Sequence, residues 1–430
     1  MQTANFSNGG QGGLRLRLLG AAAPQTLVTQ SKNGNPALVD EYLIKYMSQN
    51  ASYIGAATIQ NNYNIEDMAV SAVRLIYANH ETTARTINKA SVAFCWGIHT
   101  DGFTPLNSSG VPDNTLWVPI TSATGLVNAA SATGAATPNF DRAYTATAWQ
   151  AVPSVGSGLR YMLIRTYGQI TQTSLSGTLS SSGVAGGAWA GIDQGRHLTS
   201  CYKYASDGVT NPGSWTGVTF ADGVCPAVVQ VRSQTKGISL VGFGDSLTQG
   251  YRTGADHDSF LFKAACLASK PQAPVTWANF GVAGSQSTNF YQEALKAISG
   301  PHKPSVLVFP VSSPNDPSAT TQATLDASWA RAQDIAARCK AAGIVPVLWG
   351  PTPFYTTSQP AVRAQRDRAK AQCALSGTLY FDAYSVLENP SSPDTLNPAY
   401  DYGDRHYNEA GAAALGAAFN AAILGPLLAA

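Results

Sequence analysis

The sequence predicts an α/β domain that follows an all-β domain. After Arg232, apolar runs of strand length alternate with segments of helical period, which is typical of a parallel sheet covered by helices. Before Arg232, short segments in which apolar and polar residues alternate lie between clusters of Gly, Ser, Asn and Pro. The chain of 430 residues also exceeds a usual single domain. We expect a partly irregular segment over 1–66, a β-sandwich or jelly roll over 67–232, and a three-layer α/β/α domain over 237–430.

The all-β part is predicted from alternation, as in Val73, Leu75 and Tyr77, which share one face of a strand. The further candidate strands are residues 91–98, 116–120, 149–152, 159–167, 215–220 and 227–231. Their number and spacing suit a sandwich or jelly roll. Ahead of them, residues 36–48 are a candidate helix.

Five nearly continuous apolar runs predict parallel strands that are buried on both faces. They are residues 238–243, 275–280, 305–309, 344–348 and 378–381. Helices are predicted between them where apolar residues recur at steps of three and four, as from Leu325 to Cys339. Leu415, Phe419 and Ile423 repeat in the same way in a final helix, with Asn408 placed to cap it.

Composition excludes several classes of partner. Charged residues make up 12% of the chain, and the net charge of +2 is the difference between 27 basic and 25 acidic side chains. We therefore expect no binding to nucleic acid or to an anionic membrane. The abundance of Gly, Ser, Thr, Ala and Asn favours an extracellular or particle-associated protein. No signal peptide is visible, and no membrane span is expected. The oligomeric state is open.

The six cysteines form no C-x-x-C pair and have no histidine at ligand spacing, so no metal site is predicted. Two disulfides are considered, Cys201 with Cys225 and Cys339 with Cys373, since each pair lies in one expected domain and closes a short loop. Buried free thiols are the alternative.

Candidate chemistry lies in the loops after the strands, because ligands of open α/β sheets bind at the carboxyl ends of the strands. Gly244-Asp245-Ser246 follows the first strand in a tight turn that exposes the Ser246 hydroxyl. Gly284 follows the second strand and offers its N–H to an oxyanion, and Asn315 after the third strand can add its side-chain amide. His406, before the last helix, can accept the serine proton.

Taken together, these four loops resemble the SGNH/GDSL hydrolase family, with its GDS turn, oxyanion glycine, G-x-N-D motif and D-x-x-H motif in this order. The resemblance covers about residues 237–430 and implies a flavodoxin-like fold. It implies Ser246 as nucleophile, His406 as base, and the N–H groups of Ser246 and Gly284 with the Asn315 amide as the oxyanion hole. No cofactor is implied.

Two residues depart from the family pattern. Ser313 stands where the third motif has glycine, and Gly403 stands where the fourth has its acid, three residues before His406. We expect Asp404, two residues before His406, to orient the imidazole; Asp401, five before, is the alternative. A backbone carbonyl is a third option, which would leave a Ser-His dyad.

The resemblance implies a serine esterase that forms an acyl-enzyme, and the layout resembles carbohydrate esterases with an added β domain. We therefore expect short-acyl ester hydrolysis, with O-acetyl groups of a carbohydrate as substrate. Three alternatives remain: a lipase-like or aryl esterase for small soluble esters, an acyltransferase, and a non-catalytic glycan-binding or surface module with a degenerate hydrolase domain.

Overall fold

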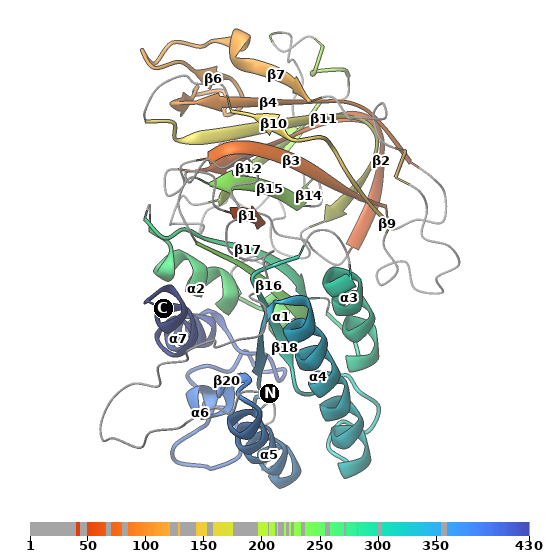
Figure 1. Ribbon diagram of the computed structural model, residues 1–430, viewed down its shortest axis with the longest axis vertical. Helices are drawn as coiled ribbons and strands as arrows, with labels where there is room; N and C mark the ends of the chain where they lie inside the picture. The colour runs from red at the N-terminus through yellow and green to blue at the C-terminus, as the bar shows by residue number, and fades with distance from the viewer. Residues whose placement is uncertain are drawn as a thin grey trace, which may run out of the picture.

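The computed structural model of the protein describes residues 40–43, 50–65, 70–79, 85–120, 128–129, 143–152, 158–174, 197–204, 206–210, 213, 219–220, 223–224, 228–233, 237–253, 259–270, 272–281, 283–299, 303–353 and 359–429. These residues form an antiparallel β region, at the top of Figure 1, and an α/β region below it.

Two antiparallel sheets make up most of the β region. The smaller has the order β1-β15-β3-β10, with β9 beside β3. Its strands are β1 Asp40–Leu43, β3 Val70–Asn79, β9 Ala143–Ala146, β10 Gln150–Ala151 and β15 Val228–Ser233. The sequence predicted antiparallel strands here, and this is confirmed.

The larger sheet has the order β13-β12-β2-β11-β4-β7, with β14 beside β11 and β8 beside β4. Its strands are β2 Asn50–Asn64, β4 Arg85–Cys95, β7 Trp117–Ile120, β8 Asn128–Ala129, β11 Tyr161–Ser174, β12 His197–Tyr204, β13 Thr219–Phe220 and β14 Gly223–Val224. A ribbon of β5 Gly97–Ile98 and β6 Pro105–Leu106 and a short helix, η1 Asn114–Leu116, lie next to it along the chain.

The N-terminal part of the chain differs from expectation in two ways. Strand β2 lies at the centre of the larger sheet, so the β region begins before residue 67. Residues Asp40–Leu43 form strand β1, paired with β15, so the candidate helix over 36–48 is wrong for these residues. The rest of that segment lies outside the described residues.

Side chains from both antiparallel sheets belong to one hydrophobic cluster. Val73 and Val231 of the smaller sheet are fully buried in it, as are Val92 and Met162 of the larger sheet. Removing such surfaces from water stabilises the fold by about 25 cal/mol per Å². The two sheets are therefore stabilised as one unit.

The α/β region contains a five-stranded parallel sheet in the order β17-β16-β18-β19-β20. The strands are β16 Ile238–Gly244, β17 Val275–Gly281, β18 Val306–Pro310, β19 Val345–Trp349 and β20 Leu379–Phe381. All five predicted strands are confirmed within two residues. This strand order, 2-1-3-4-5, is that of the flavodoxin-like fold.

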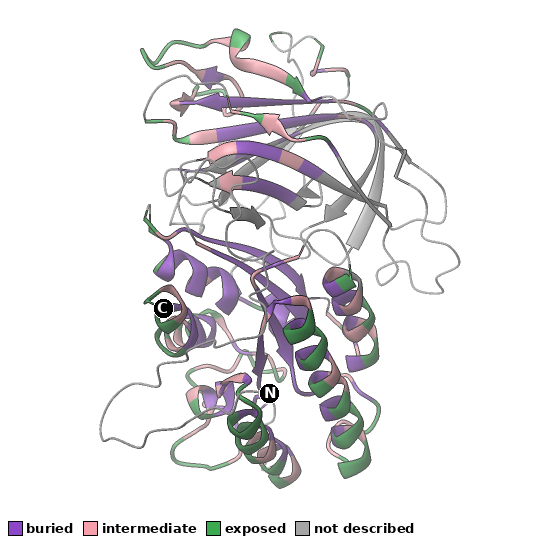
Figure 2. Ribbon diagram, viewed as in Figure 1, coloured by how far each residue is buried: buried purple, intermediate pink, exposed green. Residues whose placement is uncertain are grey.

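Helices cover both faces of this sheet (Figure 1). They are α1 Ser246–Gln249, α2 Phe260–Ala268, α3 Ser287–Ser299, α4 Gln322–Ala342, α5 Pro360–Ser376, α6 Ala383–Leu387 and α7 Glu409–Phe419, followed by a π-helical turn, Asn420–Leu424, and α8 Gly425–Ala429. Neighbouring residues of β16 belong to different clusters: Leu240 packs in the cluster described above, which also contains residues of α2 and α7, and Val241 packs in a second cluster with α3, α4 and α5. Strands β16, β17 and β18 are accordingly buried along their whole length, β19 and β20 are partly buried at their starts, and the outer helix faces are exposed (Figure 2).

The considered disulfide between Cys339 and Cys373 is wrong. Both are free, buried thiols, on α4 and α5. Burial raises the pKa of Cys339 to about 12 and that of Cys373 to about 11. These thiols therefore act as small apolar side chains. Of the other considered pair, Cys225 and the side chain of Cys201 lie outside the described residues.

The C-terminal helical segment, Glu409–Ala429, is long and apolar enough to cross a membrane by length and composition alone, with a mean hydropathy of 1.7. The sequence predicts no membrane span, and length and composition alone neither confirm nor contradict that prediction. Alanine-rich core helices also meet these criteria, and this segment has a packing role: Phe419 lies against Phe260 of α2 with ring centroids 5.7 Å apart.

Candidate active site

The turn after β16 presents Ser246 at the carboxyl edge of the sheet. Asp245 caps α1 by accepting a hydrogen bond from Leu247 N–H at 2.9 Å, and Ser246 is the first residue of that helix. Gly244 is required here, because a Cβ at this position would lie 1.9 Å from Thr248 Oγ1. The GDS sequence is thus explained by close packing of the turn against its own helix.

Ser246, His406 and Asp404 are joined by hydrogen bonds. His406 Nε2 lies 2.8 Å from Ser246 Oγ, and His406 Nδ1 lies 2.8 Å from Asp404 Oδ1. An ionised carboxylate can only accept, so a neutral His406 carries its proton on Nδ1 and accepts from Ser246 through Nε2. The structure therefore brings together three of the predicted site residues in the order that proton transfer from a serine requires.

Asp401, the alternative acid, does not contact the imidazole. Its Oδ1 accepts a hydrogen bond from Gly403 N–H at 2.8 Å. Around Asp404 the chain turns sharply, with Gly403 before it at φ 105° and Arg405 after it at φ 73°. This turn is what lets Asp404, only two residues from His406, reach its ring.

Asp404 also contacts a residue that the sequence did not single out. Arg252 donates from Nε to Asp404 Oδ2 at 3.0 Å. Partial burial raises the pKa of Asp404, but the hydrogen bonds and charges of His406 and Arg252 outweigh this and hold the pKa below its ordinary value. Asp404 is therefore ionised at neutral pH and can stabilise a protonated His406.

Two of the three predicted oxyanion donors, Gly284 and Asn315, lie in loops that follow β17 and β18. Gly284 has φ 80°, which favours glycine, and a Cβ there would meet no atom within 4 Å. The side-chain amide of Asn315 donates to Ser285 O at 3.1 Å, and an amide nitrogen carries a second N–H. The structure places both at the edge where Ser246 lies.

Three polar residues that the sequence analysis missed hold these loops against α1. Asn279 donates to Thr248 O at 2.9 Å, and Gln249 Oε1 accepts from Ala283 N–H at 2.9 Å, next to Gly284. Tyr407 donates its hydroxyl proton to Leu247 O. Only Asn279 left a signal in the sequence, as a polar residue inside an apolar strand.

Ser313, which replaces the family glycine, contacts the buried Asp245. Its Oγ lies 2.5 Å from Asp245 Oδ2 and 3.0 Å from Ser285 O. One hydroxyl proton serves one acceptor at a time. It goes to Asp245 when the carboxylate is ionised; when Asp245 is protonated, Asp245 donates to Ser313, and Ser313 donates to Ser285 O. Burial raises the pKa of Asp245 to about 6, against the lowering by Ser313 and Leu247.

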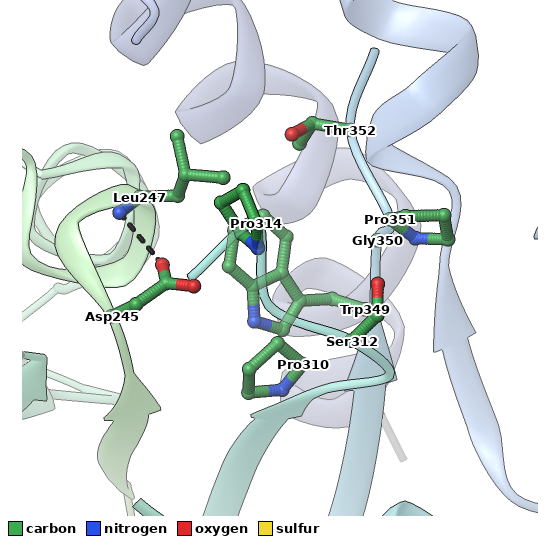
Figure 3. A pocket seen from close by; sticks show the side chains of 9 residues that line it. All are labelled: Asp245, Leu247, Pro310, Ser312, Pro314, Trp349, Gly350, Pro351 and Thr352. Carbon is green, nitrogen blue, oxygen red and sulfur yellow. Dashed lines mark hydrogen bonds between the residues drawn. The ribbon is translucent and has the colours of Figure 1, made fainter. Parts of the chain in front are cut away.

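A small cavity lies beside this turn at the sheet edge (Figure 3). It is lined by Asp245, Leu247, Pro310, Ser312, Pro314, Trp349, Gly350, Pro351 and Thr352 and leaves room for about one water-sized group. Trp349 Nε1 and Thr352 Oγ1 are buried without a hydrogen-bond partner among the residues that the structure describes. The indole nitrogen lies on the side of Asp245 and Pro310 (Figure 3). The cavity is thus lined mainly by apolar residues, with Asp245, Ser312 and Thr352 as its polar ones.

Asp245→Asn is expected to stabilise the hydrolase region at neutral pH. The amide keeps the acceptor for Leu247 N–H and donates to Ser313. The wild-type carboxyl has a folded pKa of about 6, above its ordinary value of about 4, so folding favours its protonated form. Wild-type stability from this group is therefore greatest below pH 4 and falls as pH rises through 6, by on the order of 2–3 kcal/mol.

Thermal unfolding of both proteins between pH 4 and 8 checks this. The difference in Tm between variant and wild type is expected to widen as pH rises. Asp326→Asn on α4 is a control of opposite sign, because hydrogen bonds from Arg368 and Gln322 lower the pKa of Asp326. A difference in Tm between Asp245→Asn and wild type that does not change with pH contradicts the prediction.

A three-layer α/β/α fold with a serine, a histidine and an acid hydrogen-bonded in series at the carboxyl edge of its sheet is typical of serine hydrolases. Residues 243–414 match the model of the GDSL-like Lipase/Acylhydrolase family. The C-terminal domain is therefore a GDSL-like acylhydrolase domain, and the protein is a carboxylic ester hydrolase. A comparison with curated proteins found no match.

Several solved structures are similar. A family two carbohydrate esterase from Clostridium thermocellum, in complex with cellohexaose, is 10% identical, with 92% of this chain and 96% of that chain covered and a TM-score of 0.36. An acetylxylan esterase from Geobacillus stearothermophilus is 19% identical (44% and 95% covered, TM-score 0.37). A G-D-S-L family lipolytic protein from Veillonella parvula is 16% identical (43% and 97%, TM-score 0.36). Similarity at this level does not identify a substrate for this chain.

Proposed function

We propose that this protein is a serine esterase that removes short acyl groups, O-acetyl groups of a carbohydrate, through a covalent acyl-enzyme. The hydrogen-bonded series Ser246–His406–Asp404 carries the proposal. It supplies a nucleophile, a base within 2.8 Å of it, and an acid that orients the base.

In the first step, Ser246 Oγ attacks the ester carbonyl while His406 Nε2 takes the serine proton. The imidazolium that forms is stabilised by the ionised Asp404 on Nδ1. Negative charge develops on the former carbonyl oxygen, and the N–H groups of Ser246 and Gly284 and the amide of Asn315 are the proposed donors to it. Each such donor contributes about 3 kcal/mol to the transition state.

Collapse of the tetrahedral intermediate breaks the bond to the alcohol. His406 returns its proton from Nε2 to the leaving oxygen, and the acyl group remains on Ser246. Water then attacks the acyl-enzyme with His406 again as base, which releases the carboxylic acid and restores the Ser246 hydroxyl. The proton transfer between Ser246 and His406 uses two atoms, Oγ and Nε2, that lie 2.8 Å apart.

One exposed side chain near Ser246 supports a carbohydrate substrate. Tyr402, in the loop that carries His406, is 53% exposed, and an aromatic ring offers an apolar face on which a sugar ring can pack.

The proposal is tested by hydrolysis of p-nitrophenyl acetate, butyrate and octanoate and by acetate release from acetylated xylan. We expect kcat/KM for the acetate ester to exceed that for octanoate at least tenfold. A transition state bound less tightly by about 1.4 kcal/mol gives that ratio. A preference for octanoate would instead identify a lipase-like esterase. Absence of any turnover, with no labelling by a serine-directed fluorophosphonate, would identify a non-catalytic module.

A further inference from the structure

The acid that contacts His406 is unusually exposed for its position. The side chain of Asp404 is 39% exposed, whereas that of His406 is 15% exposed. A carboxylate that is buried beside its histidine is held in place by its surroundings. Asp404, on a turn between residues of positive φ, lacks this burial and can rotate toward water unless another group holds it.

Arg252 is the group that contacts the other oxygen of this carboxylate. Its Nε lies 3.0 Å from Asp404 Oδ2, while His406 Nδ1 lies 2.8 Å from Oδ1. With one oxygen bound on each side, the carboxylate has a single orientation that serves His406. Arg252 follows α1 closely, so it links the turn that carries Ser246 to the loop that carries His406.

The guanidinium of Arg252 is itself held by two aromatic rings. It lies 4.6 Å from the ring centroid of Tyr251 and 5.1 Å from that of Tyr402, at cation–π distances. Tyr251 in turn meets the ring of His406 edge-on, with centroids 5.1 Å apart. The arginine is thus fixed by contacts from both loops, although it is 39% exposed.

We propose that Arg252 is a positioning residue for ester hydrolysis: it holds Asp404 so that Oδ1 faces His406 Nδ1. This rests on the proposed function. Exposed ion pairs contribute little to stability, so a role in stabilising the fold does not account for this pair. The effect of Arg252 is on the rate of the chemical step, through Asp404.

A double-mutant cycle of Arg252→Met and Asp404→Asn tests the proposal. Arg252→Met is expected to lower kcat about ten- to a hundredfold with KM unchanged, because misplacement of a catalytic group by about 1 Å has this effect. In the Asp404→Asn background the same change is expected to have no further effect, because its target is gone. Arg252→Lys, which can still donate to Asp404, is expected to recover part of kcat.

Arg338→Met is the matched control. Arg338 donates from Nε to Asp334 Oδ2 at 2.6 Å on the exposed face of α4, away from Ser246, and its loss is expected to leave kcat unchanged. Thermal unfolding of each variant confirms that the fold is retained.

Three results would overturn the proposal: unchanged kcat in Arg252→Met, a rise in KM alone, or an equal loss in the presence and absence of Asp404. These are distinct from failure of the proposed function, which shows as undiminished hydrolysis in Ser246→Ala. If hydrolysis depends on Ser246 but Arg252→Met has no effect on kcat, only the proposed role of Arg252 is refuted.

Discussion

Ser246→Ala is expected to reduce the hydrolysis of p-nitrophenyl acetate by about six orders of magnitude in kcat, as removal of a serine nucleophile does in other hydrolases. Without Oγ, His406 has no proton to accept, and no acyl-enzyme forms. The residual rate comes from binding and from the oxyanion donors. The Asp245 cap of α1 does not involve the Ser246 hydroxyl, so the fold should be unchanged.

Labelling by a fluorophosphonate should be lost in the same variant. Ser299→Ala is the control, because the Ser299 hydroxyl donates to Leu295 O at the end of α3. Hydrolysis that persists in Ser246→Ala at more than about a hundredth of the wild-type rate would mean that another group is the nucleophile.

Asp404→Asn is expected to lower kcat by about three to four orders of magnitude. An asparagine amide can donate to His406 Nδ1, and this stabilises the tautomer with its proton on Nε2. That tautomer cannot accept the Ser246 proton. Because the pKa of Asp404 is held below its ordinary value, the wild-type carboxylate stays ionised throughout the neutral range, and the loss should persist across it.

Asp401→Asn is a closely matched control, three residues away in the same loop. Asp401 accepts from Gly403 N–H, a bond that an asparagine oxygen can retain, so we expect less than about a tenfold change. A large loss in Asp401→Asn with none in Asp404→Asn would reverse the assignment. Little loss in either would identify a dyad.

The parallel sheet was predictable because its strands are buried on both faces. A run such as residues 238–243 is apolar almost throughout, and the observed strand β16 is Ile238–Gly244. The loops at the strand ends then followed from the direction of the strands, and with them the positions of Ser246, Gly284, Asn315 and His406.

Strand β2 was missed because its buried side chains are polar. Gln60 and Asn62 are fully buried, and Gln60 Oε1 accepts from Nε of the buried Arg165 at 2.7 Å. A strand whose inward face carries amides gives no apolar alternation, so the pattern that reveals most strands is absent. Such polar contacts between distant segments become visible only in three dimensions.

The orienting acid could not be chosen from spacing alone. Whether Asp404 or Asp401 reaches His406 depends on the backbone of Gly403 and Arg405, which have positive φ. The contact of Asp404 with Arg252 joins residues 152 positions apart, and that of Ser313 with Asp245 joins residues 68 apart. Side-chain pairs at such separations have no signature in a single sequence.

The separation of Ser246 and His406 ties activity to the integrity of the whole domain. Their hydrogen bond, like that between Tyr407 and Leu247, closes a loop of 160 residues. Closing a long loop costs entropy, which the packing of the intervening strands and helices must offset. Hydrolysis therefore reports on the folded state of the complete segment between α1 and α7, and not only on the few residues that carry the chemistry.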